Sequence, residues 1–274
     1  MIEALQFDFM RHALVAGALV SIACGVIGVY VVVNRLVFVS GGIAHAAYGG
    51  IGLGYFLGIN PVWGAIAFSL AAALGMGLVQ RKTRHRADTI IGVMWAIGMA
   101  AGILFVDLTR GYVVDLMSYL FGSILTVPRS DLVLMAILDV VIVALVAAFY
   151  KELLALSYDE TFATVENVPV GTIYIILLCL VALTVVMLMR VVGLIMVIAL
   201  LTMPAAISEQ FTSNLKKMMI LSIVLGIVFT TTGLWLSYAL NLTSGATIIL
   251  VSGTVFLLSL LYKAVAKRRA RIQA

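Results

Sequence analysis

The chain has 274 residues, of which 64% are hydrophobic and 11% are charged, and its formal net charge is +5. A soluble domain carries about 25% charged residues, so this composition excludes an ordinary soluble protein. The sequence contains no Walker A motif, zincin motif or pair of catalytic acids. The chain is therefore not expected to be an enzyme or to hydrolyse ATP itself.

Apolar segments of about 20 residues, the length that crosses a bilayer core, recur along the chain. They predict one all-α polytopic transmembrane bundle, residues 1–274, with nine spans at 12–33, 36–58, 62–80, 88–106, 131–149, 171–189, 192–211, 218–240 and 245–262. The apolar piece from Leu116 to Val127, followed by Pro128, is too short to cross and is interpreted as an interfacial or re-entrant helix. The count becomes eight if one segment is re-entrant.

Lysine and arginine gather on one side of this predicted topology. Most of the 17 lie in segments 34–35, 81–86, 150–168 and 212–217 and in the tail 263–274, and only Arg11, Arg110, Arg129 and Arg190 lie on the other side. Because cytoplasmic loops carry an excess of Lys and Arg, the N-terminus is predicted outside and the C-terminus in the cytoplasm. The positive charge then reflects topology, so no nucleic-acid partner is expected. The basic tail is expected to meet anionic lipid headgroups.

Glycines dominate the second predicted span, which contains VSGGIAHAAYGGIGLGYFLG. Gly42, Gly50, Gly54 and Gly58, together with Ala46, recur at intervals of four residues. This spacing puts them on one stripe of a helix, where small residues let another helix approach backbone to backbone. The stripe is therefore predicted to pack against a neighbouring helix. The adjoining face carries Gly41, His45 and Gly49.

Two ionisable side chains fall near the middle of predicted spans. His45 lies nine residues inside its span, roughly 14 Å deep at about 1.5 Å per residue, and Asp139 lies at a similar depth in the fifth span. Ionisable groups at this depth usually face the bundle interior or a water-filled path. Both are candidate metal ligands, either paired or coordinating one cation together. A neutral His45 bonded to a neighbouring helix and a protonated Asp139 bonded to a backbone carbonyl are the alternatives.

The longest predicted cytoplasmic loop, about residues 150–170, carries signals of a short helix. Ser157 or Asp159 can cap a helix that runs through Val165. Asn167 stands where the chain must turn out of that helix, and asparagine tolerates the left-handed conformation needed there. We expect this helix to display Tyr158, Phe162 and Ala163 as a knob that a partner protein grips; an ordinary surface helix is the alternative.

Four segments of the chain, in this order, resemble successive motifs of one family: NRLVFVSGGIAHAAYGGIGLGYFLG, YLFGSIL, YDETFATVENVPVG and VVGLIMVIALLTMPAAIS. The family comprises the metal-ion permeases of ATP-binding-cassette importers, which carry manganese, zinc or iron. The similarity covers nearly the whole chain. It implies the fold of the vitamin B12 and siderophore importers with the first helix missing, which also has nine spans and an outside N-terminus.

The resemblance implies roles for individual residues. The family usually reads Gly-Asp-Ala-Ile-Ser-His in the second span, where the Asp and His coordinate metal in transit. This chain keeps the histidine as His45 but has Gly41 in place of the aspartate. In the loop, Asp159, Phe162 and Ala163 match the coupling helix that docks into the ATPase.

The resemblance also implies partners. They are a cytoplasmic ATP-binding subunit, an extracytoplasmic metal-binding protein and a second permease copy in a homodimer, in the cell membrane of a bacterium or archaeon. No cofactor is expected: the metal is bound in transit and ATP is bound by the partner subunit. Two rivals stay open, an importer of a small metal chelate and a stand-alone ion-coupled carrier that uses His45 and Asp139.

Overall fold

The computed structural model describes residues 6–82, 87–109, 119–120, 122–194 and 197–273, and in these ranges it contains helices and no strands. The helices are α1 (Asp8–Val33), α2 (Val37–Leu57), α3 (Pro61–Lys82), α4 (Ala87–Asp107), the 3₁₀ turn η2 (Ile124–Thr126), α6 (Arg129–Ala148), α7 (Tyr150–Tyr158), α8 (Glu160–Val165), α9 (Val170–Val191), α10 (Val197–Phe211), α11 (Leu215–Leu240) and α12 (Ser244–Gln273). The predicted all-α class is confirmed.

Eight of the described helices are long and apolar enough to cross a membrane: α1, α2, α3, α4, α6, α9, α11 and α12. The predicted span 192–211 corresponds to α10, which is apolar but has only 15 residues. The chain turns ahead of α10 at Gly193, whose φ of 79° lies in the left-handed region that glycine adopts without strain. Of the predicted interfacial helix, Leu116 to Val127, residues 116–118 and 121 lie outside the described residues, and its last part contains η2.

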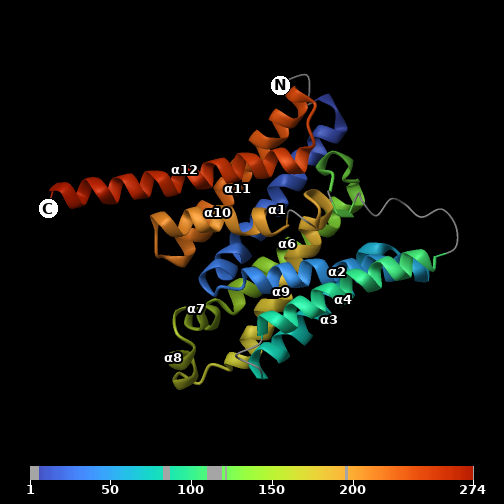
Figure 1. Cartoon of the computed structure of the whole chain (residues 1–274), viewed down its shortest axis with the longest axis horizontal. Coiled ribbons are helices and arrows are strands. Elements are labelled where there is room, and N and C mark those ends of the chain that lie inside the picture. Colours follow the sequence, from blue (N-terminus) through green and yellow to red (C-terminus); the bar gives the residue numbers. More distant parts are fainter. Residues whose placement is uncertain (1–5, 83–86, 110–118, 121, 195–196, 274) are drawn as a thin grey trace.

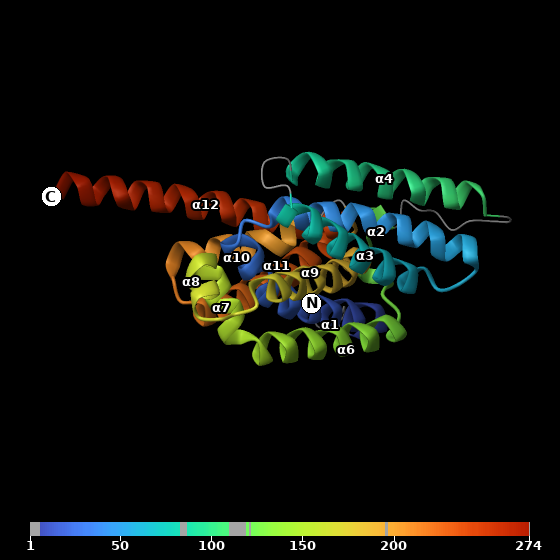
Figure 2. The same ribbon diagram turned by 90° about the horizontal axis from the view of Figure 1, so that it is seen from below.

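The helices form two neighbouring groups. In the first, α1 is the central element and packs against α11, α10, α6 and α9. In the second, α2 lies between α3 and α4, and α3 joins this group to α9. Figure 2 shows α4 and α6 at opposite edges of the bundle, with α1 and α9 between them. The middle of α1 is buried all round, which explains why its sequence is apolar without a polar stripe.

The last helix, α12, runs without a break for 30 residues. Its first half packs against α11 and α10, and its C-terminal half extends beyond the bundle in both views (Figures 1 and 2). Its large apolar side chains from Leu257 to Val265 are exposed. The helices α7 and α8 form a separate corner of the molecule, on the side toward which the end of α12 projects (Figure 1).

Candidate functional site

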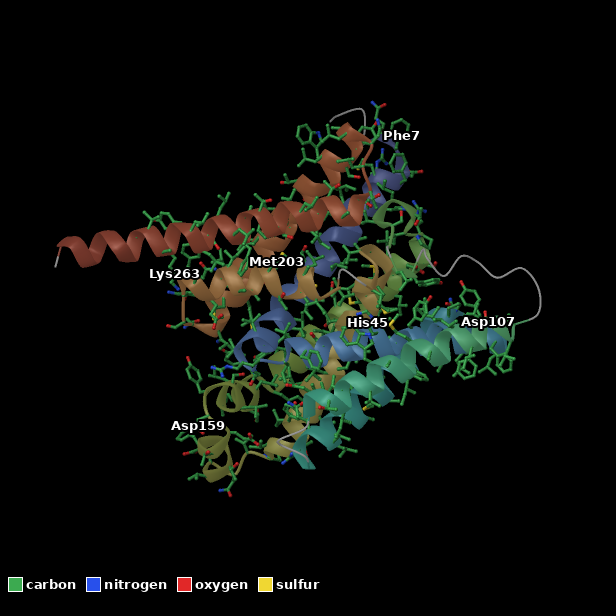
Figure 3. The ribbon with its side chains drawn as sticks, in the orientation of Figure 1. Phe7, His45, Asp107, Asp159, Met203 and Lys263 are labelled. Carbon is green, nitrogen blue, oxygen red and sulfur yellow. The ribbon has the colours of Figure 1, made fainter. Side chains whose placement is uncertain are left out.

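His45 lies in the middle of α2 and faces α4. Its imidazole ring stacks on the indole of Trp95, with ring centroids 3.9 Å apart and planes inclined by 14°. Its Nδ1 atom lies 3.3 Å from the thioether sulfur of Met99. Trp95 and Met99 are four residues apart, so they share one face of α4. The histidine side chain remains partly accessible, and Figure 3 shows it between the end of the molecule that carries Asp107 and the corner that carries Asp159.

Asp139, the other candidate ligand, lies on α6 and is 5% exposed. Both of its carboxylate oxygens are buried without a hydrogen-bond partner. Its helix packs on α1 and α9, whereas His45 packs on α4. Since α4 and α6 lie at opposite edges of the bundle, the structure does not bring the two side chains together (Figure 2). Among the residues described, no group of three or more His, Cys, Asp or Glu side chains could hold a metal ion.

The glycines of α2 make backbone contacts with both neighbouring helices. On the α3 side, Gly50 faces Gly64 so closely that a Cβ atom on either would collide with the other's carbonyl oxygen, and a Cβ on Gly54 would lie 2.7 Å from Cα of Pro61. On the α4 side, a Cβ on Gly49 would lie 2.8 Å from the carbonyl oxygen of Gly98. The small residues therefore set the spacing of three helices around His45.

Two members of the predicted stripe differ in their environment. A Cβ at Gly42 would lie 2.6 Å from Cγ2 of Ile91, so this position is tightly packed as expected. At Gly58, however, a Cβ would meet nothing within 4 Å. Gly58 has a φ of 67° and ends α2 in the left-handed conformation. Its inclusion in the packing stripe was wrong: the residue ends the helix, for which glycine is suited because it lacks a Cβ atom.

The short helix α8 begins and ends as the loop sequence predicts. The carboxylate of Asp159 accepts hydrogen bonds from the backbone N–H groups of Thr161, at 2.7 Å, and Phe162, at 3.3 Å. The bonds from Phe162 and Thr161 stabilise the charged form and lower the pKa of Asp159 below its usual value. At the other end Asn167 has a φ of 58°, which confirms the predicted left-handed turn.

The expected display of side chains on α8 requires two corrections. Tyr158 and Phe162 are exposed, by 69% and 57%, but Tyr158 is the last residue of α7 and Ala163 is fully buried. The carbonyl of Ala163 accepts the N–H of Val168, which closes the C-terminal turn of the helix. Ala163 therefore lies on the inner face of α8, where its small side chain lets the helix pack closely against the rest of the protein.

A hydrogen bond that the sequence did not suggest ties this corner to the start of α2. The side-chain amide of Asn34, which follows α1, donates to Oγ of Ser157 on α7 at 2.9 Å. The same amide nitrogen donates to the carbonyl of Tyr30, and the hydroxyl of Ser157 donates to the carbonyl of Leu153. Asn34 and Ser157 are 123 residues apart, so no local pattern could have paired them. The contacts of Trp95 and Met99 with His45 also join segments far apart in the sequence, so no local pattern could have paired them.

Eight described helices that are long and apolar enough to cross a membrane define a polytopic helical membrane protein. Residues 6–263 match the model of the ABC 3 transport family, and the chain belongs to that family.

Individual relatives match over almost their full length. An uncharacterized membrane protein of Synechocystis sp. is 58% identical over 263 residues, which cover 96% of this chain and 94% of that protein. The manganese transport system membrane protein MntC of Listeria monocytogenes is 35% identical over 258 residues, covering 94% and 92%. Among solved structures, PsaBC from Streptococcus pneumoniae in complex with Fab matches with a TM-score of 0.85 and 32% identity, over 94% of this chain and 93% of that one.

Proposed function

We propose that this chain is the membrane permease subunit of an ATP-binding-cassette importer for divalent metal ions, with residues 1–274 forming its single transmembrane domain. The observation that carries the proposal is the likeness over more than 90% of the chain to a protein named for manganese transport. The eight long apolar helices support the same role, because a permease must line its path with helices that cross the bilayer.

His45 is proposed as the residue that the ion meets in transit. It is an imidazole, a common metal ligand, in the middle of a long apolar helix, and it remains partly accessible. The glycines around it keep bulky side chains away from the helix surface. One weak site suits transport, since an ion in transit must bind loosely enough to leave. Because Asp139 lies on the far side of the bundle, the relay of a stand-alone carrier that joins it to His45 is not supported.

The helix α8 is proposed as the contact with the ATPase subunit. It exposes an aromatic side chain, Phe162, on a helix whose two ends are fixed by Asp159 and Asn167. An importer of this family works with an ATPase and a substrate-binding protein. We further propose that two copies of the chain form the pore, and that ATP binding and hydrolysis move α8 and so alternate the access to His45.

The predicted orientation agrees with this assignment. Lys263, in the C-terminal half of α12, and Asp159, beside α8, lie toward the same side of the molecule, and the far end of α4 at Asp107 lies away from them (Figure 3). A cytoplasmic α8 meets a cytoplasmic ATPase, and the basic C-terminal tail then meets the anionic inner surface of the bacterial membrane.

The test is metal uptake by cells that express the permease with its ATPase and binding protein. His45→Gln keeps a side chain of similar size that can form a hydrogen bond but is a poor ligand for metal ions. We expect it to reduce uptake of the transported ion, assayed separately with manganese, zinc and iron, by at least several-fold. The matched control is His12→Gln at the start of α1, which should transport normally.

Co-purification with the ATPase separates the possible failures. If His45→Gln transports at the normal rate while the ATPase co-purifies with the permease, the chain is an importer whose metal path lies elsewhere. If no ATPase is retained by the wild-type permease and its uptake continues without ATP, the importer assignment is wrong.

A further inference from the structure

The contact between His45 and Met99 joins two side chains that are both capable of binding metal. The Nδ1 atom of His45 and the sulfur of Met99 lie 3.3 Å apart across the α2–α4 interface. A zinc ion binds imidazole nitrogen at about 2.0–2.1 Å and thiolate sulfur at about 2.3 Å. The neutral thioether of methionine is a weaker donor than a thiolate, and at a similar Zn–S distance an imidazole nitrogen and a thioether sulfur on one ion would lie roughly 3.5 Å apart. The two donor atoms are therefore already close to the separation that a shared ion requires.

Trp95 holds the histidine in the orientation that this contact needs. Its indole lies almost parallel to the imidazole at 3.9 Å and covers one face of the ring. A metal ion binds a ring nitrogen in the plane of the imidazole, at its edge, so the stacked indole leaves the coordinating edge open. The edge that carries Nδ1 points at Met99.

The backbone around the pair keeps α4 within reach of α2. A Cβ atom at Gly98 would lie 2.6 Å from Cα of Ala46, and one at Gly102 would lie 2.6 Å from the carbonyl oxygen of Tyr48. Gly98 is the residue before Met99, and Ala46 is the residue after His45. This close approach allows a methionine on α4 to reach the histidine, and the flexible thioether chain can adjust by the few tenths of an ångström that coordination requires.

The face of α2 that carries His45 offers few oxygen atoms that could bind a metal ion. One turn before His45, position 41 is a glycine, and a side chain there would meet Cδ1 of Ile198 on α10 at 2.8 Å. Carboxylate and carbonyl oxygens suit manganese, whereas thioether sulfur and imidazole nitrogen suit zinc and other softer ions. The residues that meet at this site thus differ from the ligands that manganese prefers.

We propose that Met99 is a sulfur ligand to the ion that passes His45, and that it shifts the preference of this permease toward Zn²⁺ over Mn²⁺. The inference rests on the proposed transport function and names the determinant of selectivity within it. Trp95 is a positioning residue that acts through His45.

The experiment is X-ray absorption at the zinc edge on the purified full-length permease loaded with one equivalent of Zn²⁺. The wild-type spectrum should contain a nitrogen shell at about 2.0–2.1 Å and a sulfur shell near 2.3–2.5 Å. In Met99→Leu the sulfur shell should disappear while the nitrogen shell remains. Competition between Zn²⁺ and Mn²⁺ for the same samples should show a loss of zinc preference of roughly tenfold in Met99→Leu.

The control is Met94→Leu. Met94 is also on α4, but its methyl group lies 3.0 Å from the position of a Cβ at Gly75 on α3, so it points away from His45. This variant should keep both the sulfur shell and the zinc preference. A wild-type spectrum with nitrogen and oxygen alone overturns the proposal without any variant, and assigns the 3.3 Å contact to an N–H···S hydrogen bond. That result leaves the transport function intact. The transport function fails instead if cells expressing the wild-type permease with its ATPase and binding protein take up neither metal.

Discussion

The helices α2 and α8 carry the two halves of the proposed function and are stabilised in opposite ways. α2 is long and largely buried, and its glycines place the backbones of α3 and α4 against its own. α8 has six residues, exposes most of its side chains and is held by hydrogen bonds at its two ends. The close packing of α2 depends on its glycines, which have no side chain. The backbone of α8 is fixed at its two ends by the carboxylate of Asp159 and by the left-handed conformation of Asn167.

Because of this difference, substitutions in α2 should affect the stability of the fold, and substitutions in α8 should affect the coupling to the ATPase. A methyl group added to a glycine of α2 would overlap the backbone of a neighbouring helix. Backbone cannot move aside as a flexible side chain can, so the substitution lowers the stability of the fold. A change on the exposed face of α8 meets solvent in the isolated permease and acts only where a partner docks. Substitutions in the two helices should therefore give distinct signatures in stability and in transport.

The largest loss of stability is expected from Gly50→Ala. Its new methyl group would overlap the backbone of Gly64 and lie 2.6 Å from Cβ of Phe68. Overpacking of this kind costs about 3 kcal/mol or more when rigid backbone must move. The apparent melting temperature of the permease in detergent should fall by several degrees, and uptake should fall with it.

The control for this prediction is Gly92→Ala on α4, where a Cβ would meet nothing within 4 Å. Here the same change should leave stability unchanged or raise it by up to about 1 kcal/mol, because alanine favours helix over glycine. Equal melting temperatures for the two variants would mean that α2 and α3 do not approach as closely as the structure indicates.

The largest effect on coupling is expected from Phe162→Asp. The side chain is 57% exposed, so the isolated variant should fold and melt like the wild type. A charge placed in an apolar docking surface is costly without a partner. Retention of the ATPase on the tagged permease, and ATP-driven uptake, should therefore collapse.

Phe211→Asp, at an equally exposed phenylalanine at the end of α10, is the comparison for that experiment. It should keep the ATPase bound. If Phe162→Asp assembles and transports like the wild type, α8 is an ordinary surface helix, and the docking assignment has to be given up.

The same contrast explains which features the sequence could predict. The cap at Asp159 and the left-handed turn at Asn167 depend on residues within one short segment, so residue type and order are sufficient to place them. The partners of His45 come from another helix, 50 and 54 positions further along the chain. Their approach depends on the packing of α4 against α2, which no local pattern encodes.

The expectations for Gly58 and Ala163 were wrong for different reasons. Gly58 continues a spacing of four residues, but the helix ends there, and periodicity alone does not mark the last turn. Ala163 was expected on the display face because a six-residue helix has too few positions to fix which face turns inward. Its burial is set by packing against the rest of the protein.

A smaller effect is expected from breaking the bond between Ser157 and Asn34. Ser157→Ala removes the acceptor on α7 but leaves the bond from Asn34 to Tyr30 intact. A typical hydrogen bond contributes about 1 kcal/mol, so stability should change little. This bond joins α7, next to α8, to Asn34, which precedes the turn into α2. Without the bond, we expect about two- to threefold more ATP to be hydrolysed per ion transported.

Thr254→Ala is the control for that measurement. The Thr254 hydroxyl donates to the carbonyl of Leu250 within α12, far from α7, so this change removes a helical hydroxyl without touching the corner. It should leave the ratio of hydrolysis to transport unaltered. An unchanged ratio in Ser157→Ala as well would restrict the Asn34 bond to a structural role.

The smallest effect is a pH dependence confined to α8. Hydrogen bonds from Phe162 and Thr161 lower the pKa of Asp159 below its ordinary value of 3.8. A carboxyl whose folded pKa is lowered stabilises the helix fully above the ordinary value, and this contribution is lost as pH falls through the folded pKa. Amide exchange of residues 160–166, corrected for its intrinsic rate, should show protection that is constant near neutrality and decreases below about pH 4. Asp159→Asn keeps an acceptor for the cap but does not titrate, so its protection should be independent of pH over the same range. Protection that decreases equally in both proteins would show that another group controls the helix, and the cap would then contribute nothing to its acid sensitivity.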